Sequence, residues 1–517
     1  MEFLRKHLKF YHGVLLLAGG AFCVYFWSID STPLLREEDW SVMVALANLF
    51  GHPHYVIGRV IEAGGFFIPI WRMEHVGSVM EYLMFPILWL GGVHTHVIRF
   101  GEIFYLILAA VLAAVAVRRL AGVRSGLIAL FLILFHSGLY YWGLHGFVGE
   151  VPQLHLCVVL SVLLFVRWVQ TPSVLTAILW GFMVGVGMYT KMHLLWQCLG
   201  YGIFWIVVLA RHKFLGAWKH FLCYLAGFFL SPVAIINYLS GGAEIKETMA
   251  AWGARHSMSR LHVPQEMIPH SAWDYLSYRI QVVGRFMLGW ETPPVILGIL
   301  MLLPFGVLLW WFFKKKDEPV RRQVCLTWFL IVVIHTVGVY TPVHISEETF
   351  LVILPLLLMC VAVAMDSMFK RSWVIVLLLG LAWFEHGRQI EKGINWGDIR
   401  HHTSEEPAEF MLCRGIHSPI TVTLPESLSL AVVTRHRICP RSYWDSRGKN
   451  RRRFYEEAME NRNNWYVYAY EDDFAPQEEI VWFEKFEAQK NLREKNVRVF
   501  NLGPRDYVKL FQLEPKT

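Results

Sequence analysis

Long apolar segments almost free of charged residues dominate the first 390 residues and leave few folds open to this chain. Residues 13–29 contain no charged side chain and are long enough to cross the hydrocarbon core of a bilayer as a helix. Residues 1–390 hold 28 basic and 21 acidic groups, whereas the 127 residues from 391 to 517 hold 20 of each. This distribution excludes a disordered or small disulfide-rich protein. It predicts a polytopic α-helical membrane protein with a soluble C-terminal domain.

About eleven apolar segments are predicted to span the membrane. They are residues 13–29, 100–117, 126–142, 153–168, 174–189, 194–210, 221–238, 295–313, 326–340, 349–365 and 373–384. The stretch 83–92 is too short to cross and is predicted to lie as a helix at the membrane interface. Three glycines in the fifth segment, Gly181, Gly185 and Gly187, predict close packing against a neighbouring helix.

Basic clusters follow the second, sixth, eighth and tenth predicted spans, which is the alternation expected of cytoplasmic loops. The clusters are Arg118, Arg119 and Arg124; Arg211, Lys213 and Lys219; Lys314 to Lys316 with Arg321 and Arg322; and Lys370 with Arg371. The N-terminus is then cytoplasmic. The opposite side carries a first external loop (30–98), a second (143–152), a long external loop (240–294) and the tail. We therefore expect the chemistry outside the cytoplasm, with residues 1–390 as the catalytic membrane domain.

The tail, residues 391–517, reads as an extracytoplasmic α/β domain. Residues 420–424 alternate as a strand does, residues 465–470 are rich in β-prone aromatic side chains, and residues 453–461 form a short polar helix between them. Cys413 and Cys439 lie in this tail and can pair if it faces an oxidising compartment.

Acidic residues stand out in the external loops. Glu38 and Asp39 open an apolar-periodic stretch, residues 42–50, which suits a helix N-terminus where the dipole favours acids. The alternative is that one of these carboxylates points into a cleft as a general base. Glu74 lies later in the same loop, and Glu150 is the only acid of the second loop. Placed together, they form a carboxylate-lined site at the outer membrane surface.

Several short motifs follow one another in a characteristic order within residues 1–195. They are Glu38-Asp39, Glu74-His75 leading to Gly91-Gly92, Arg99, a basic turn ending at Arg124, Glu150-Val-Pro152 and Thr190-Lys191. In this order and loop placement the chain resembles the GT-C glycosyltransferases. It is most similar to the bacterial aminoarabinose transferases and the protein O-mannosyltransferases, which use polyprenyl- or dolichyl-phosphate sugars.

The resemblance implies an inverting transfer of a sugar from a polyprenyl phosphate to an extracytoplasmic acceptor, which can be a glycan, a lipid or a protein. Asp39 or Glu38 is then the general base, and Glu74 and Glu150 orient the acceptor or the sugar. Residues expected to bind substrate, chiefly the donor phosphate, are His75, Lys191, Glu81, Arg255, Arg260 and Arg285. Arginine suits phosphate because its planar fork gives two directed hydrogen bonds.

Several departures keep other interpretations open. The acidic pair reads Glu then Asp, the reverse of the usual family order, and Glu347-Glu348 stands where many relatives have an Arg-Tyr pair. The alternatives are a lipid or solute transporter and a catalytically inactive lipid-binding subunit with this fold. No cofactor is required, although Asp39 and Glu150 are able to share a divalent ion such as Mg²⁺ or Mn²⁺.

The expected surroundings follow from the same analysis. We expect an integral membrane protein of the bacterial cytoplasmic (inner) membrane, with membrane lipids among its partners. Residues 447–453 are basic but lack an aromatic platform, so nucleic acid is not expected as a partner. No glycine-rich nucleotide-binding loop is present, which agrees with a lipid-linked donor.

Overall fold

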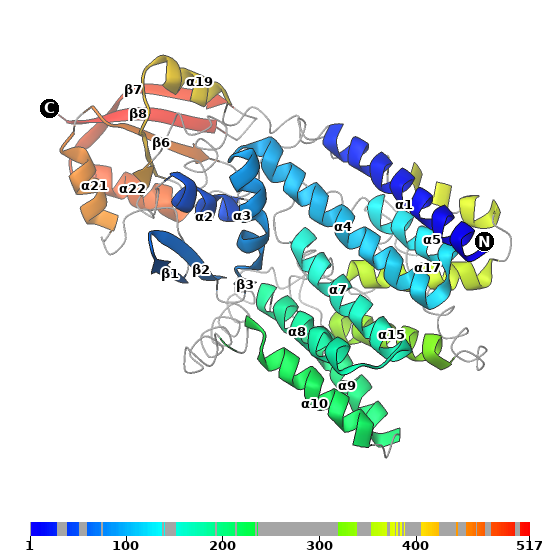
Figure 1. Ribbon diagram of the computed structural model, residues 1–517. Helices are drawn as coiled ribbons and strands as arrows, with labels where there is room; N and C mark the ends of the chain where they lie inside the picture. Colours follow the sequence, from blue (N-terminus) through cyan, green and yellow to red (C-terminus); the bar gives the residue numbers. More distant parts are fainter. Residues whose placement is uncertain are drawn as a thin grey trace, which may run out of the picture. The chain divides into compact units, whose positions relative to one another are not determined.

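The structure is a computed structural model (Figure 1). It describes residues 2–27, 39–50, 59–73, 76–136, 139, 151–191, 194–211, 215–232, 235, 319–338, 353–369, 373–377, 379–380, 383–384, 387, 405–422, 441–442, 451–461, 463–470, 477–501 and 507–516. The chain divides into two compact units. The first comprises Met1–Trp27, Ile70–Met80 and Glu102–Glu391, and the second comprises Ser28–Pro69, Glu81–Gly101 and Lys392–Thr517.

Apolar helices form most of the described part of the first unit. They are α1 (Glu2–Trp27), α4 (Thr95–Ala121), α5 (Val123–Leu134), α7 (Val151–Gln170), α8 (Val174–Thr190), α9 (Leu195–Arg211), α10 (Leu215–Phe229), α15 (Pro319–Gly338) and α17 (Leu354–Met368). Among the described residues, three stretches are long and apolar enough to cross a membrane: Leu8–Trp27, His96–Ala121 and Val151–Gln170. A helical membrane protein is therefore supported, and the total of eleven spans stays a prediction.

Several predicted spans had wrong bounds. Helix α10 begins at Leu215, six residues before the predicted 221–238, and ends at Phe229, nine residues before the predicted end. The described helix α5 ends at Leu134, short of the predicted 126–142. Helix α15 begins at Pro319, seven residues before the predicted 326–340, so Arg321 and Arg322 lie in its first turns instead of a loop. Proline suits the first position of a helix because its missing N–H has no intrahelical partner there. The predicted span 295–313 lies outside the described residues.

Glycines bring α8 and α10 into backbone contact, as the sequence predicted. A methyl group at Gly181 would collide with the carbonyl oxygen of Tyr224, and one at Gly227 would collide with that of Ile178. Next to this contact, α7, α8, α9 and α10 share an aromatic core around Trp180 and Trp205, whose rings stack with centroids 5.6 Å apart. Both tryptophans are fully buried, so this four-helix group has a tightly packed interior.

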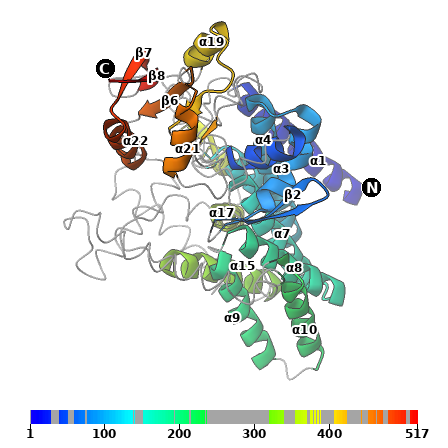
Figure 2. The same cartoon turned by 90° about the vertical axis from the view of Figure 1, so that its left-hand side faces the viewer.

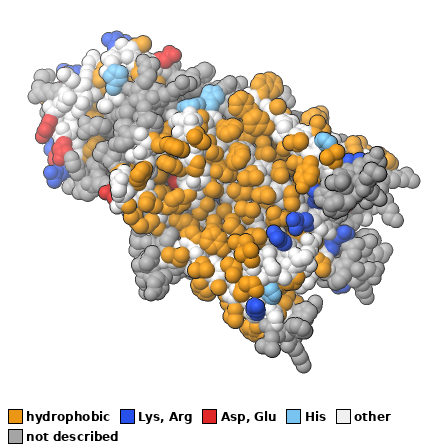
Figure 3. All heavy atoms as spheres, viewed as in Figure 1, with side chains coloured by type: hydrophobic (Ala, Val, Ile, Leu, Met, Phe, Trp, Pro, Cys, Tyr) orange, Lys and Arg blue, Asp and Glu red, His pale blue; other side chains and the backbone are white. Residues whose placement is uncertain are grey.

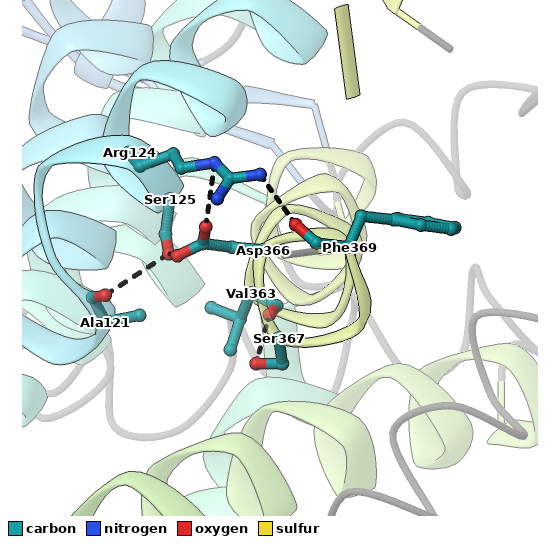
Figure 4. Close-up of polar contacts among 7 residues, drawn as sticks. All are labelled: Ala121, Arg124, Ser125, Val363, Asp366, Ser367 and Phe369. Atoms are coloured by element: carbon teal, nitrogen blue, oxygen red, sulfur yellow. Dashed lines mark hydrogen bonds and ion pairs between the residues drawn. The ribbon is translucent and has the colours of Figure 1, made fainter. Parts of the chain in front are cut away.

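Hydrogen bonds from arginine side chains to carbonyl groups join the ends of several helices around the turn 118–124. We call this turn and the helix ends in contact with it the basic end. Figure 4 shows Arg124 between α5 and α17, with Nε 3.2 Å from the carboxylate of Asp366 and Nη2 2.6 Å from the carbonyl oxygen of Phe369. Ser125 also donates to Asp366. Gln170, at the end of α7, donates to the carbonyl oxygen of Arg119.

Two further contacts belong to the basic end. Arg321 of α15 donates to the carbonyl oxygen of Leu120, and the Arg118 guanidinium lies 4.3 Å from the ring centroid of Phe10 in α1. Two of the basic clusters that the sequence placed in cytoplasmic loops, those of Arg118 to Arg124 and of Arg321, therefore meet at this end of the unit. Figure 3 shows Lys and Arg at the right-hand end of a broad hydrophobic surface, as expected of helices that face lipid.

The first external loop contains two helices and a small sheet. Helix α2 (Asp39–Phe50) begins at the predicted acids, and α3 (Val79–Gly91) is the apolar helix predicted at the interface. Between them, β1 (Arg59–Ala63), β2 (Phe66–Met73) and β3 (Val76–Gly77) form a sheet in that order. The sheet was not predicted. Gly64 and Gly65 join β1 to β2 with φ of 58° and 82°, the positive values that a tight two-residue hairpin requires.

The C-terminal part of the second unit is an α/β domain, as predicted. Its sheet has the order β5-β4-β6-β8-β7, and its elements are α19 (Glu405–Cys413), β4 (Ile420–Thr421), β5 (Arg441–Ser442), α21 (Arg451–Met459), β6 (Trp465–Tyr470), α22 (Gln477–Gln489), β7 (Leu492–Asn501) and β8 (Tyr507–Pro515). Strand β4 pairs parallel with β5 and β6, whereas β8 pairs antiparallel with β6 and β7. The predicted strand 465–470 and the predicted helix 453–461 are both confirmed, the helix with its start and its end two residues earlier.

Helices cover both faces of this sheet, as Figures 1 and 2 show. Tyr466 packs with α21 and α22 on one face, and the next residue, Val467, packs with α19 on the other. This alternation along β6 is the period of two expected of a strand buried on both faces. Cys413 is an exposed free thiol, and Cys439 lies outside the described residues.

Candidate functional site

The C-terminal end of α8 carries the predicted Thr190-Lys191 pair. Lys191 leaves the helix in an extended conformation (φ −153°, ψ 122°), while its N–H still donates to the carbonyl oxygen of Gly187. The residue is buried, with 3% of its surface exposed. Because a buried ammonium group needs anionic or polar neighbours, this position suits a cation that meets a phosphate.

The first turn of α7 lies at the same end, because α7 runs antiparallel to α8. The Sγ atom of Cys157 is 3.7 Å from Oγ1 of Thr190. Val151, the first residue of α7, lies about 9 Å further along the axis at 1.5 Å per residue. Glu150 directly precedes Val151 and lies outside the described residues. The sequence therefore attaches the only acid of the second loop to this end of α7.

A third segment reaches this end from the first external loop. Strands β2 and β3 pair antiparallel, with Trp71 opposite Gly77. The Tyr189 hydroxyl donates to the carbonyl oxygen of Ile70, and a methyl group at Gly77 would collide with the carbonyl oxygen of Tyr189. The hairpin is thus held directly against the last turn of α8.

The connection of this hairpin is the predicted Glu74-His75 pair. Glu74 and His75 lie outside the described residues, but Met73 and Val76, which flank them, are paired in the sheet. Strands β2 and β3, the start of α7 and Lys191 at the end of α8 therefore approach one another within the first unit. We call this region the Lys191 end.

Five further predicted residues have side chains outside the described part of the structure. Asp39 begins helix α2 in the second unit, and its side chain lies outside the described residues, as does Glu38. The same holds for the predicted phosphate ligands of the long loop, which are Arg255, Arg260 and Arg285. The catalytic and phosphate-binding roles of these five residues stay predictions.

Glu81 lies in the first turn of α3 and is buried, with 4% exposed. Its neighbour Tyr82 donates a hydrogen bond of 2.5 Å to the carbonyl oxygen of Pro69. Burial, and secondarily the Glu81 carboxylate, raise the pKa of Tyr82 above its ordinary value. Tyr82 is therefore a neutral hydrogen-bond donor at physiological pH. A substrate-binding role for Glu81 stays a prediction.

The Lys191 end and the basic end lie at opposite ends of the same helices. Helix α7 starts at the Lys191 end and reaches the basic end at Gln170, while α8 returns from Val174 to Thr190. Twenty residues of helix span about 30 Å, which matches the hydrocarbon thickness of a bilayer. A basic end on one side of a membrane thus places the Lys191 end on the other side.

Two polar residues at the Lys191 end escaped the sequence analysis. Gln153, in the first turn of α7, and Ser78, which directly follows β3, are both fully buried. In the described part of the chain, neither side chain has a hydrogen-bond partner. A lone Gln or Ser in sequence looks like an ordinary helix-end or turn residue, and only the packing shows that each is shut off from solvent.

A metal site is not formed by the described residues, among which no three His, Cys, Asp or Glu side chains come together. The carboxylates considered for a shared Mg²⁺ or Mn²⁺ ion, those of Asp39 and Glu150, are not among them.

Comparison with known proteins gives matches at the level of structure alone. The sequence matches no model of a known protein family and no curated protein sequence. The structure of ArnT from Cupriavidus metallidurans without ligand matches with a TM-score of 0.53 and 13% identity, covering 96% of this chain and 97% of ArnT. The same protein bound to undecaprenyl phosphate gives 0.52 and 13%, with the same coverage.

A third match has a lower score. The oligosaccharyltransferase of Archaeoglobus fulgidus with a tethered acceptor peptide gives a TM-score of 0.47 and 12% identity over 99% of this chain and 74% of its own. The likeness to ArnT, an aminoarabinose transferase, extends over nearly the whole of both chains. This chain therefore has the fold of ArnT, in agreement with the resemblance drawn from its sequence motifs.

Proposed function

We propose that this protein is a membrane glycosyltransferase that moves a sugar from a polyprenyl phosphate to an acceptor outside the cytoplasm. The observation that carries the proposal is the meeting of strands β2 and β3, the start of α7 and Lys191 at one end of a fold shared with ArnT. ArnT has this fold over the full chain and binds undecaprenyl phosphate. The location in a cytoplasmic membrane, with the basic end inside, belongs to the same proposal.

The reaction needs an acceptor nucleophile, a base that takes its proton and a cation that stabilises the leaving phosphate. An acceptor hydroxyl or amine attacks the anomeric carbon, the bond from that carbon to the phosphate oxygen breaks, and polyprenyl phosphate leaves with the electron pair of that bond. A carboxylate, Asp39 or Glu38, takes the proton of the acceptor. In-line attack inverts the configuration of the anomeric carbon. Lys191 stabilises the negative charge that develops on the leaving phosphate.

Lys191 suits this role because of its surroundings. Its residue is 97% shielded from solvent, and a charge interaction is stronger in such an environment than in water. His75 belongs to the connection between β2 and β3, and Gly77 of β3 packs on Tyr189, two residues before Lys191 in the sequence. His75 is therefore our candidate to assist Lys191 in binding the phosphate. Glu150 and Glu74 would hold the acceptor or the sugar against the base.

The test measures the release of undecaprenyl phosphate from undecaprenyl-phosphate-linked sugars by the purified full chain in nanodiscs. We expect Asp39→Asn or Glu38→Gln to lower the rate by about 100-fold or more, as for loss of a general base. Lys191→Met should lower both the rate and the affinity for undecaprenyl phosphate. Glu62→Gln, at an exposed acid of the same external loop, and Lys219→Met, at an exposed lysine after α9, are the matched controls.

The alternatives predict different results. A transporter or an inactive lipid-binding subunit leaves every lipid-linked sugar intact in this assay. Wild-type protein that binds undecaprenyl phosphate but releases none from a panel of pentose and hexose donors would overturn the proposal. Full activity in both carboxylate variants would overturn the assignment of the base alone.

A further inference from the structure

Gln153 is a buried polar side chain with nothing in the described structure to bind. None of its surface is exposed, and neither its Oε1 nor its Nε2 atom has a hydrogen-bond partner among the described residues. Native proteins pair nearly all buried polar atoms, and an exception calls for an explanation such as a ligand. Within the described structure, the carboxamide is therefore free to accept two hydrogen bonds and to donate two.

The position of Gln153 on α7 directs it toward the Lys191 end. Residues four apart share a face of a helix. Cys157, four residues later, contacts Thr190, and Ser161, four residues after that, accepts a hydrogen bond of 2.8 Å from Gln197. Gln153 is thus the first of three polar residues on the inward face of α7. Helical side chains lean toward the N-terminus, so its amide extends beyond the level of Thr190.

A second unpaired polar group lies at the same end. The hydroxyl of Ser78 is buried and has no partner within the described residues. Ser78 directly follows Gly77, which abuts the carbonyl oxygen of Tyr189 on the last turn of α8. Two buried polar groups from different segments therefore border the region next to Lys191, and each has unused hydrogen-bonding capacity.

The chemistry of these groups differs from that of a phosphate site. A phosphate oxygen accepts hydrogen bonds and leaves the Oε1 atom of a glutamine unsatisfied. A sugar hydroxyl both donates and accepts, so it pairs with Oε1, Nε2 and a serine hydroxyl together. Lys191 suits the anionic part of a donor, and Gln153 with Ser78 suits the neutral hydroxyl-bearing part.

We propose that Gln153, assisted by Ser78, binds a hydroxyl group of the sugar on the lipid-linked donor and so determines which sugar is transferred. This inference rests on the proposed function, because it assigns the sugar subsite of that reaction. A site that hydrogen-bonds a substrate hydroxyl discriminates strongly against an analogue without it, because the buried protein groups are then left unpaired.

The test compares Gln153→Met with Gln197→Met in the full chain in nanodiscs. Both replace a buried glutamine of the same helix group by an apolar side chain of similar length. Gln197 has partners, Ser161 at 2.8 Å and Tyr201 at 3.4 Å, so its loss should lower the melting temperature. Gln153→Met removes an unpaired group, so it should leave the melting temperature unchanged or raise it.

The functional readout is the kcat/KM of undecaprenyl phosphate release from pentose and hexose donors and from their monodeoxy analogues. We expect the wild type to prefer the best hydroxylated donor over one deoxy analogue by about 100-fold. Gln153→Met should reduce that preference at least tenfold and leave the affinity for undecaprenyl phosphate unchanged. Ser78→Ala, which removes one oxygen atom, should reduce the same preference and serves if Gln153→Met fails to fold.

Three outcomes overturn the inference. The first is an unchanged preference for the hydroxylated donor over its deoxy analogue in Gln153→Met, or in Ser78→Ala if Gln153→Met does not fold. This result is expected if bound water satisfies these groups. Alternatively, Gln153→Met weakens undecaprenyl phosphate alone as much as the sugar-lipid, which makes it a phosphate ligand. Finally, Gln153→Met lowers the melting temperature as Gln197→Met does. A wild-type protein that releases no undecaprenyl phosphate refutes the proposed function itself, a result separate from all three.

Discussion

Gly77→Ala is the sharpest test of how the β2–β3 hairpin is positioned against α8. A Cβ atom at this position would overlap the carbonyl oxygen of Tyr189, and ring atoms of Tyr189 lie within 2.7 Å of it. The ring can rotate away, but the carbonyl oxygen is part of the last turn of α8 and has no alternative rotamer. The hairpin must therefore retreat from α8.

The size of this retreat sets the expected loss of activity. Ordinary contact between non-bonded heavy atoms is about 3.5–4.0 Å, so the backbone must move by on the order of 1 Å. A misplacement of about 1 Å in a catalytic group can lower the rate by about 100-fold. Glu74 and His75 connect the two strands that would move. We therefore expect kcat for undecaprenyl phosphate release to fall by about 100-fold in Gly77→Ala.

The matched control is Gly202→Ala in α9. No atom lies within 4 Å of a Cβ built there, so the same chemical change meets open space. Alanine also favours a helix by about 1 kcal/mol over glycine, so Gly202→Ala should be active and slightly more stable. The melting temperature of both variants shows whether the fold survives. A Gly77→Ala protein with wild-type kcat and an intact fold would refute the role of the hairpin in positioning.

Two further predictions concern stability. At the basic end, Arg124→Met and Asp366→Asn should show a coupling free energy of about 1 kcal/mol in a double-mutant cycle of unfolding. The coupling is modest because the two side chains are 37% and 20% exposed and therefore only partly desolvated. Purely additive effects on the free energy of unfolding would contradict the ion pair. In the C-terminal domain, burial raises the pKa of Glu487 to about 7, and the nearby Glu494 carboxylate adds to this shift. The pKa of Glu487 is thus higher in the folded than in the unfolded state. The folded state therefore loses stability as the pH rises from about 4.5 through 7. Glu487→Gln should therefore slow hydrogen exchange of α22 in the full chain more at pH 8 than at pH 5, whereas Glu409→Gln, at an exposed acid of α19, should change neither; an equal effect at both pH values would contradict the raised pKa.

The sequence allows prediction of those features that depend on local pattern. Apolar length marks α1, α4 and α7 as helices, and the alternation of aromatic residues marks β6. Spaced glycines predict close packing of α8 against another helix, which the collision at Gly181 confirms, although only the structure identifies α10 as the partner. These signals are local because a helix or strand must bury a face regardless of its partner.

The features missed depend on partners distant in sequence. The β1–β2 hairpin had a signal, Gly64-Gly65 between two apolar runs, but an apolar run beside a membrane span reads equally well as an interfacial segment. Gln153 and Ser78 carry no pattern at all, since their burial depends on tertiary packing and not on local sequence. The start of α15 at Pro319 was missed because charged Arg321 and Arg322 break the apolar run without breaking the helix.

The separation of the two ends of α7 has an energetic consequence. Nucleotide sugars are made where nucleoside triphosphates are available, which is the side of the basic end in the proposed orientation. A sugar consumed at the Lys191 end, about one bilayer thickness away, must arrive already activated. In the proposed reaction, the free energy for each new glycosidic bond is stored in the carrier's phosphate ester before the lipid changes leaflet.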